Sequence, residues 1–177
     1  MLSYSLLDGI QKLVPGAKFK GQFVNNNEIE YGTITWLDTR EKPSFIAVDQ
    51  AALTVFRKNI RTAINIKTTQ IIKHFNYNGN FVYMDLEFQF NMSQLVVMKD
   101  YLTYPYTMKI HDDEDGCGVY FTVNNSDELV SLYQAGFMHV SQTLAEGRQL
   151  KDQLKNMNRT ELEEFQDTRV VYDESVE

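Results

Sequence analysis

The chain has 177 residues, of which 43% are hydrophobic and 12% aromatic, and its formal net charge is −7. This composition supports a folded core and excludes an intrinsically disordered protein. No stretch approaches the ~20 apolar residues of a membrane helix, and the N-terminus lacks the basic-then-apolar order of a signal peptide. We therefore expect a protein that is made and kept in a cytoplasm.

Residues 1–45 predict a small module made of a helix and a β-hairpin. The segment Leu2–Val14 places apolar side chains on one helical face, and the Pro15-Gly16 pair ends that helix. We expect the hairpin strands at Ala17–Val24 and Glu28–Leu37, because both segments are rich in aromatic and β-branched residues and three asparagines separate them.

Residues 46–158 predict a second domain of mixed helices and hairpins, so the expected fold class is α+β. Its hairpins are indicated by Asn-Gly and Asp-Gly pairs, which tolerate the backbone angles of tight turns. The expected elements are a helix over Ala47–Phe75, a hairpin through Asn78-Gly79, a short helix over Met92–Leu102, a hairpin with strands Tyr106–His111 and Cys117–Val123, and a long amphipathic helix over Asn125–Asn158.

The long C-terminal helix carries the first indication of function. At ~1.5 Å per residue it would span roughly 50 Å, more than the ~30 Å of a small domain. Its apolar residues recur every ~3.4 positions, which is closer to a coiled-coil seam than to a 3.6-residue core face. The stripe consists of Tyr133, Phe137, Val140, Leu144, Leu150, Leu154 and Met157. The pattern leaves two alternatives open, a helix buried in its own domain and a helix that packs against a partner.

Charge is unevenly distributed along the chain. The helix before Phe75 carries five basic residues between Arg57 and Lys73 and no acidic one. It has neither interleaved aromatic residues nor a docking motif for nucleic acid, so we expect it to pair with the acidic half of this chain or with a neighbouring protein. Residues 159–177 form an acidic tail, in which a Thr-x-x-Glu pattern predicts a brief helix capped at Thr160. We expect a neighbouring chain to hold this tail.

Residues that could carry chemistry lack the required spacing. The acidic run Asp112–Asp115 ends in a hairpin glycine and lacks the alternating ligands of a calcium loop, so we expect a solvated turn. The three histidines have no metal-binding spacing, and Cys117 beside that turn is expected to be a small filler. The sequence predicts no catalytic residue, no metal and no cofactor, and hence no enzyme. A small hydrolase or nuclease that uses the acidic turn is the lowest-ranked alternative.

Several short motifs carry a resemblance to a known family. They are Phe75-Asn76-Tyr77-Asn78-Gly79, then Phe88-Gln89-Phe90-Asn91-Met92, and Val119-Tyr120-Phe121-Thr122 entering the long helix. With these motifs, the block Ile66–Met157 resembles a domain of unknown function at the C-terminus of small tailed-bacteriophage tail-fibre and tail-fibre-assembly proteins. The resemblance is one of pattern and includes no catalytic residue.

This resemblance implies a non-enzymatic structural component of a phage tail, at the baseplate, nozzle or fibre attachment, that joins or positions a larger fibre protein. The alternative is an assembly chaperone that is absent from the mature virion. The implied location is the virion tail, with the host cytoplasm during assembly. The expected partners are other tail or fibre proteins, with an oligomer within the tail left open, and neither nucleic acid nor membrane is expected.

The predicted partner-binding residues fall into two groups. The apolar ones lie on the long helix and are Phe137, Val140, Leu144, Leu150 and Leu154. The basic ones lie on the preceding long helix and are Arg57, Lys58, Arg61 and Lys67. The apolar group would supply buried contact area, and the basic group would set the orientation of the partner.

Overall fold

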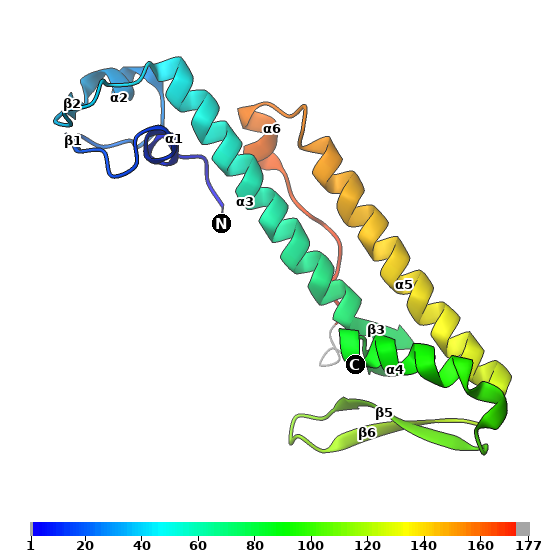
Figure 1. The fold of residues 1–177 in the computed structure, drawn as a ribbon. Coiled ribbons are helices and arrows are strands. Elements are labelled where there is room, and N and C mark those ends of the chain that lie inside the picture. Colours follow the sequence, from blue (N-terminus) through cyan, green and yellow to red (C-terminus); the bar gives the residue numbers. More distant parts are fainter. Residues whose placement is uncertain (1, 173–177) are drawn as a thin grey trace. The chain divides into compact units, whose positions relative to one another are not determined.

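The computed structural model describes residues 2–172 and contains helices and two-stranded antiparallel sheets (Figure 1). The helices are α1 (Leu6–Leu13), α2 (Glu28–Thr33), α3 (Phe45–Lys73), α4 (Leu86–Val97), the 3-10 helix η1 (Lys99–Tyr101), α5 (Ser126–Gln153) and α6 (Arg159–Glu164). The strands pair as β1 (Phe19–Lys20) with β2 (Thr35–Trp36), β3 (His74–Tyr77) with β4 (Asn80–Tyr83), and β5 (Tyr106–Asp112) with β6 (Gly118–Val123). The predicted α+β class is confirmed.

The chain divides into two compact units. Unit 1 consists of Met1–Ile64 and Leu150–Asp167, and unit 2 of Asn65–Gln149 and Thr168–Glu177. This division differs from the predicted segments 1–45, 46–158 and 159–177. The predicted boundary between residues 45 and 46 does not separate the units, because unit 1 takes its core residues from α3 as well as from the N-terminal segment.

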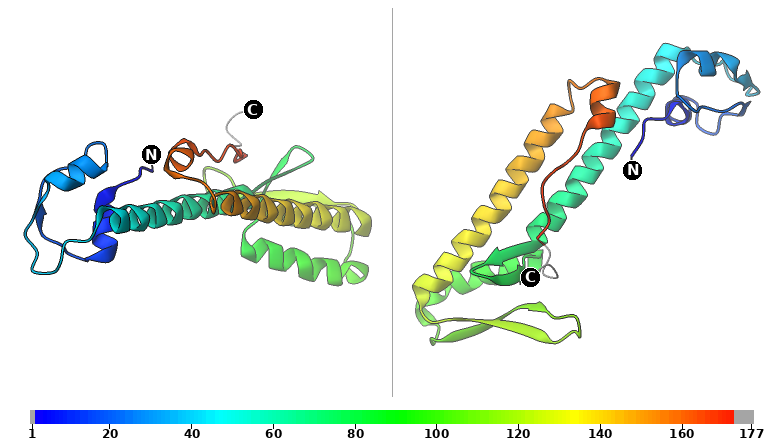
Figure 2. Two further views of the ribbon diagram at one scale, coloured as in Figure 1. Left: turned by 90° about the horizontal axis from the view of Figure 1, so that it is seen from above. Right: turned by 180° about the vertical axis from the view of Figure 1, so that it is seen from behind.

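The core of unit 1 joins residues from both ends of the chain. Leu6 and Ile10 of α1 pack in one buried cluster with Val48 and Phe56 of α3 and with Leu162 of α6. Figure 2 shows α6 beside α3 from two further sides. The Arg159 guanidinium lies 4.0 Å from the centroid of the Tyr4 ring. The start of the predicted acidic tail is therefore held by its own chain, and Asp173, Glu174 and Glu177 lie outside the described residues.

The predicted strand Glu28–Leu37 is wrong for most of its length, because Glu28–Thr33 forms helix α2. The side chain of Asn27 caps this helix by accepting a hydrogen bond from the Glu30 backbone N–H at 2.9 Å. Only Thr35 and Trp36 pair with β1, so the hairpin is reduced to two residue pairs. The local capping interaction outweighs the strand propensity of Ile29 and Tyr31.

The long C-terminal helix ends at Gln153, short of the predicted Asn158. Asn158 instead caps α6, because its side chain accepts from the Glu161 backbone N–H at 3.1 Å and Glu161 accepts in return from the Asn158 N–H at 2.6 Å. The predicted cap residue, Thr160, lies inside α6. An asparagine two residues earlier thus forms the capping box that was expected at the threonine.

In unit 2 both predicted hairpins are confirmed. Asn78 and Gly79 have φ values of 50° and 77°, as the turn between β3 and β4 requires. Gly116 has φ 78° at the turn that precedes β6. The short helix α4 begins at Leu86, six residues before the predicted start, because the Asp85 side chain accepts from the Phe88 N–H at 2.7 Å and caps it.

The part of α5 in unit 2 buries a different stripe from the predicted one. Its buried residues are Leu129, Leu132, Gly136, Thr143 and Gly147. The small residues allow close approach, since a Cβ on Gly147 would lie 2.7 Å from Thr68 Oγ1 on α3. Phe137 and Leu144 of the predicted stripe lie one position beyond this face and are 61% and 39% exposed. Among residues 2–172, no helix has the length and apolar character needed to cross a membrane.

Candidate partner-binding surface

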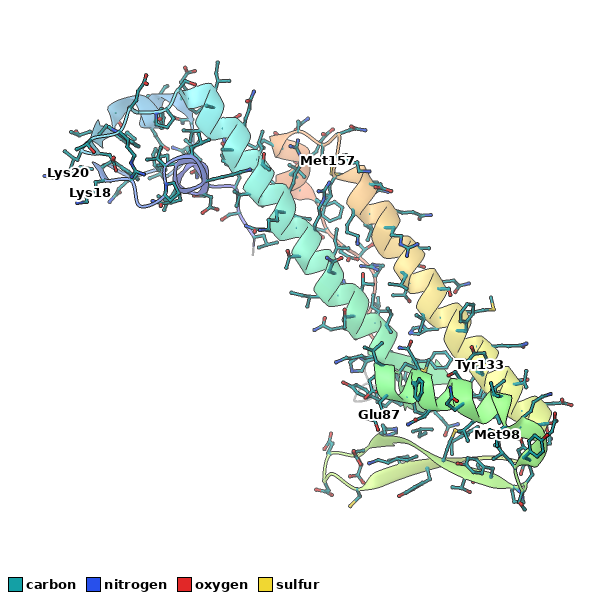
Figure 3. The ribbon with its side chains drawn as sticks, viewed as in Figure 1. Lys18, Lys20, Glu87, Met98, Tyr133 and Met157 are labelled. Carbon is teal, nitrogen blue, oxygen red and sulfur yellow. The ribbon has the colours of Figure 1, made fainter. Side chains whose placement is uncertain are left out.

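Helix α4 of unit 2 is apolar around most of its circumference. Glu87 is its only charged residue between Leu86 and Val97. Met92 points into the unit 2 core and is 3% exposed, whereas Leu86, Phe90 and Val97 are 83%, 63% and 74% exposed. Figure 3 labels Glu87 and Met98, which lie near the two ends of this helix. Neighbouring apolar side chains exposed on one helix face often mark an interaction site, so the outer face of α4 is a candidate contact surface.

A groove lies between α4 and α5, and we refer to it as the α4–α5 groove. Its volume is about 190 Å³. Its apolar lining includes Met84, Phe88, Met92, Tyr133, Phe137 and Val140. Gly136 allows Met84 to pack closely against α5, since a Cβ at this position would lie 2.7 Å from Met84 Cε.

Two polar side chains of the groove wall, Gln89 and Ser93, are hydrogen-bonded within the protein. Gln89 Nε2 donates to the Met84 carbonyl oxygen at 2.9 Å, and Ser93 Oγ donates to the Phe90 carbonyl oxygen at 2.6 Å. The groove favours apolar side chains, and its methionines can adapt to their shape.

A second hollow of about 570 Å³ lies on the other side of α4, toward β5. Leu95, Met98, Leu102 and Met108 are among its lining residues, and Phe88 borders both hollows. Apolar depressions thus flank α4 on two sides. This arrangement extends the contact surface beyond the α4–α5 groove.

A third hollow, of about 350 Å³, is more polar than the other two and is bordered by Asp85, Glu87, Lys109, His111 and Asp112. The Lys109 Nζ and an Asp112 carboxylate oxygen form an ion pair at 2.5 Å, and this contact raises the pKa of Lys109. Lys109 and Asp112 are each about half exposed, so their ion pair is largely screened by solvent. We assign no chemistry to this hollow.

The structure separates the predicted apolar contact residues into two places. Phe137 and Val140 line the α4–α5 groove in unit 2. Leu144 is partly exposed on the same helix but is not among the groove residues. Leu154 is fully buried in the unit 1 core with Ile60 and Ile64, and Leu150 packs against that core. The stripe within unit 1 is therefore covered by this chain.

The predicted basic residues do not form one surface. Arg57 is half-buried in unit 1, where its Nη2 donates to the Met157 carbonyl oxygen at 2.7 Å. Lys58 is exposed, and Arg61 lies close enough to Asp152 to contribute, after Lys155, to a lowered pKa of that carboxyl. Lys67 belongs to unit 2. Arg57 thus has a structural role at the segment between α5 and α6.

The acidic turn is held by its own hydrogen bonds. Asp113 Oδ1 accepts from the backbone N–H of Asp115 at 3.1 Å and from that of Cys117 at 2.7 Å. Residues Asp112–Cys117 are all exposed, which is the predicted solvated turn. Within the part of the chain that the structure describes, no group of three His, Cys, Asp or Glu side chains is placed to hold a metal ion.

His139 has a structural place in unit 2. Its Nε2 lies 2.9 Å from the Ile71 carbonyl oxygen, and its ring centroid is 4.9 Å from that of Phe75. These contacts join α5 to the end of α3 and to β3. His139 is therefore accounted for by packing.

The α4 half of the surface was not predicted from the sequence, although a signal is present. Twelve residues with a single charge form a run that is too apolar for an exposed helix. The expected short helix over Met92–Leu102 overlapped only its second half. The predicted partner-binding residues therefore include none of the exposed residues of α4.

Comparisons with known proteins found no relative of this chain. No protein-family model matches the chain, and neither a curated protein nor a solved structure is detectably similar to it.

Proposed function

We propose that this protein is a non-enzymatic structural component of a bacteriophage tail, which binds a larger tail or fibre protein through α4 and the α4–α5 groove. The single observation that carries the binding role is the exposed apolar face of α4, with Leu86, Phe90 and Val97 uncovered. The resemblance of residues 66–157 to phage tail-fibre proteins supports the tail setting.

The energetics of the α4 face support a binding role. Burial of one large apolar side chain contributes about 1.5–3 kcal/mol. Leu86, Phe90 and Val97 lie on a rigid helix, so little conformational entropy opposes their burial by a partner. Covering this face would therefore contribute roughly 5–9 kcal/mol, part of which offsets the cost of association.

A transient binder is the second candidate, and the methionines favour it. Met84 and Met92 line the α4–α5 groove, and Met92, Met98 and Met108 line the hollow on the other side of α4. Flexible methionine-rich surfaces accommodate more than one partner shape. This property suits an assembly chaperone that masks a fibre interface and then leaves.

Composition of purified particles tests the tail role. Virions of the phage that encodes this chain would be purified and examined by mass spectrometry, and the structural role predicts that the chain is present in stoichiometric amounts. Its absence from virions, with co-purification on newly made fibre, would support the chaperone. Absence from both would overturn both roles.

A photo-crosslinking residue at Phe90, compared with one at the exposed residue Glu41 of unit 1, tests the surface. We expect the Phe90 position to capture one tail or fibre protein in infected cells. Equal capture from both positions would reject α4 as the contact.

A further inference from the structure

We propose that the occupant of the α4–α5 groove is an amphipathic helix of a partner protein, with an apolar face flanked by lysine and arginine. This inference rests on the proposed binding role of the surface and names the chemistry of the partner.

The size of the α4–α5 groove favours a few inserted side chains over a complete small molecule. Ligand pockets usually enclose about 300–1,000 Å³, whereas this groove holds about 190 Å³. It is lined along α4 from Phe88 to Ser93 and along α5 from Leu132 to Val140. A row of anchors at helical spacing, of the i, i+3 or i+4, i+7 kind, matches such a site.

The helical walls of the groove indicate that the bound segment of the partner is a helix. Both walls are helices, whose backbone N–H and C=O groups are paired along their own axes. They offer no strand edge with which an extended peptide could pair. A segment that enters an apolar groove must then satisfy its own backbone groups, and a helix does so.

The charge of the two wall helices and of unit 2 indicates which charge the partner helix carries beside its apolar face. No lysine or arginine occurs between residues 86 and 98 on α4 or between 126 and 147 on α5. The residues that line the groove are uncharged, and the charged residues of these two helix segments are all acidic, namely Glu87, Asp127, Glu128 and Glu146. Over its described residues, unit 2 carries 10 acidic and 6 basic side chains, whereas those of unit 1 balance. Basic flanks on the partner therefore gain from long-range attraction.

The same charge argues against a second copy of this chain as the occupant. Two copies of unit 2 facing each other would bring together two bodies that both carry a net negative charge. The residues beyond Tyr172 are Asp-Glu-Ser-Val-Glu and share that sign. A basic partner helix is thus favoured over any segment with the charge of unit 2.

Fluorescently labelled synthetic peptides test the inference on the full chain. The first peptide is an amphipathic helix with leucines at i, i+3, i+4 and i+7 and lysines elsewhere. The second has glutamates in place of the lysines, and the third keeps the lysines but scrambles the leucines. Fluorescence anisotropy should show that the first binds roughly tenfold or more tightly than either control at low salt, with the advantage over the second narrowing at high salt.

Two matched variants test whether the peptide binds in the α4–α5 groove. Ser93→Lys and Ser93→Glu both put a long side chain in its wall, so any steric effect is shared, whereas the sign of the charge differs. We expect Ser93→Lys to weaken the basic peptide at least about fivefold more than Ser93→Glu at low salt. Circular dichroism and the unfolding midpoint would confirm that both variants remain folded.

Three results would overturn the inference: equal binding of the basic and acidic peptides, equal effects of the two Ser93 variants, or a groove-dependent dimer in sedimentation that binds no peptide. The tail role fails separately. If Phe90 captures a tail protein and the basic peptide does not bind, the surface stands and the partner chemistry is wrong. If the basic peptide binds and virions lack the chain, the partner chemistry stands and the tail role is wrong.

Discussion

Glu30 accepts hydrogen bonds from three consecutive backbone amides, those of Val24, Asn25 and Asn26, at 2.9–3.0 Å. These contacts lower the pKa of the Glu30 carboxyl, and the hydrogen bond from the Asn25 backbone has the largest effect. A lowered folded-state pKa means that the stabilisation is present above the unfolded-state pKa and is lost as pH falls through the folded-state value.

We expect Glu30→Gln to lower the unfolding midpoint of unit 1 at about pH 7, and the difference from wild type to shrink toward about pH 3. The emission of Trp36, the only tryptophan, reports this unit. Glu41→Gln, at an exposed position, serves as control. A Glu30→Gln effect that is independent of pH would contradict the assignment.

The two buried glycines of α5 differ in what surrounds them. An added Cβ lies 2.7 Å from Met84 Cε at Gly136, which is the end of a flexible chain, and 2.7 Å from Thr68 Oγ1 at Gly147. That hydroxyl also accepts from Arg169 Nη2 at 3.0 Å, so it is fixed in place. The two sites therefore respond differently to the same substitution.

We expect Gly136→Ala to leave unit 2 unchanged or up to about 1 kcal/mol more stable, since alanine favours the helix. Gly147→Ala should destabilise unit 2 by about 1–2 kcal/mol, because overcrowding outweighs the same helix preference. Hydrogen exchange of unit 2 peptides measures both free energies. A shift of the same sign and size in both variants would refute the distinction.

Among the elements, α6 offers a direct comparison of two cap positions. Asn158 forms the capping box with Glu161, whereas Thr160 lies within the helix. Asn158→Ala should therefore cost about 1 kcal/mol of the unfolding free energy of unit 1. Thr160→Ala should change it by less than about 0.5 kcal/mol. Chemical denaturation followed by Trp36 fluorescence measures both, and a larger cost at Thr160 would restore the cap predicted from the sequence.

Elements with one strong local signal were predictable from the sequence, whereas those that depend on a single capping pair or on distant packing were not. Asn78-Gly79 specifies its own turn, so the hairpin β3–β4 was predicted at nearly the correct residues. The segment of helix α2 predicts a strand, because its apolar residues outnumber the single capping pair Asn27–Glu30. The predicted apolar stripe of α5 differs from the buried one, because Gly136 and Thr143 are buried although neither has a large apolar side chain.

The candidate site shows the same limit. Phe137 and Val140 were predicted as contacts from helical spacing alone. Phe88 and Met92 complete the groove from a helix whose start depends on the Asp85 cap and whose orientation depends on contacts with other elements. Leu154 was placed on the contact surface although it is buried, because α1 and α3, which cover it, are distant in sequence.

For the whole molecule, unit 1 requires the C-terminal segment. Leu154 and Leu162 are fully buried in its core, and loss of one such leucine side chain typically costs about 2–5 kcal/mol. Truncation after Gln149 removes both, which approaches the total stability of a small domain. Truncation after Asp167 keeps both and removes only Arg169, Tyr172 and their neighbours from unit 2.

We expect truncation after Gln149 to shift Trp36 emission to the red and to abolish its cooperative unfolding. Truncation after Asp167 should leave both unchanged and increase hydrogen exchange in unit 2, where Tyr172 stacks on Phe81 at 6.1 Å. A cooperative Trp36 transition in the shorter chain would show that the N-terminal segment folds without its C-terminal partners.

The two-part composition of unit 1 has a consequence for synthesis on the ribosome. Leu6, Ile10 and Val48 leave the ribosome before the hairpins of unit 2, and Leu162 leaves after them. At a synthesis rate of about 5–20 residues per second, roughly ten seconds pass between the synthesis of the first half of this core and that of the second. Unit 2 can thus fold while the N-terminal segment still exposes its apolar face, and the nascent chain is most prone to aggregation or chaperone capture during that interval.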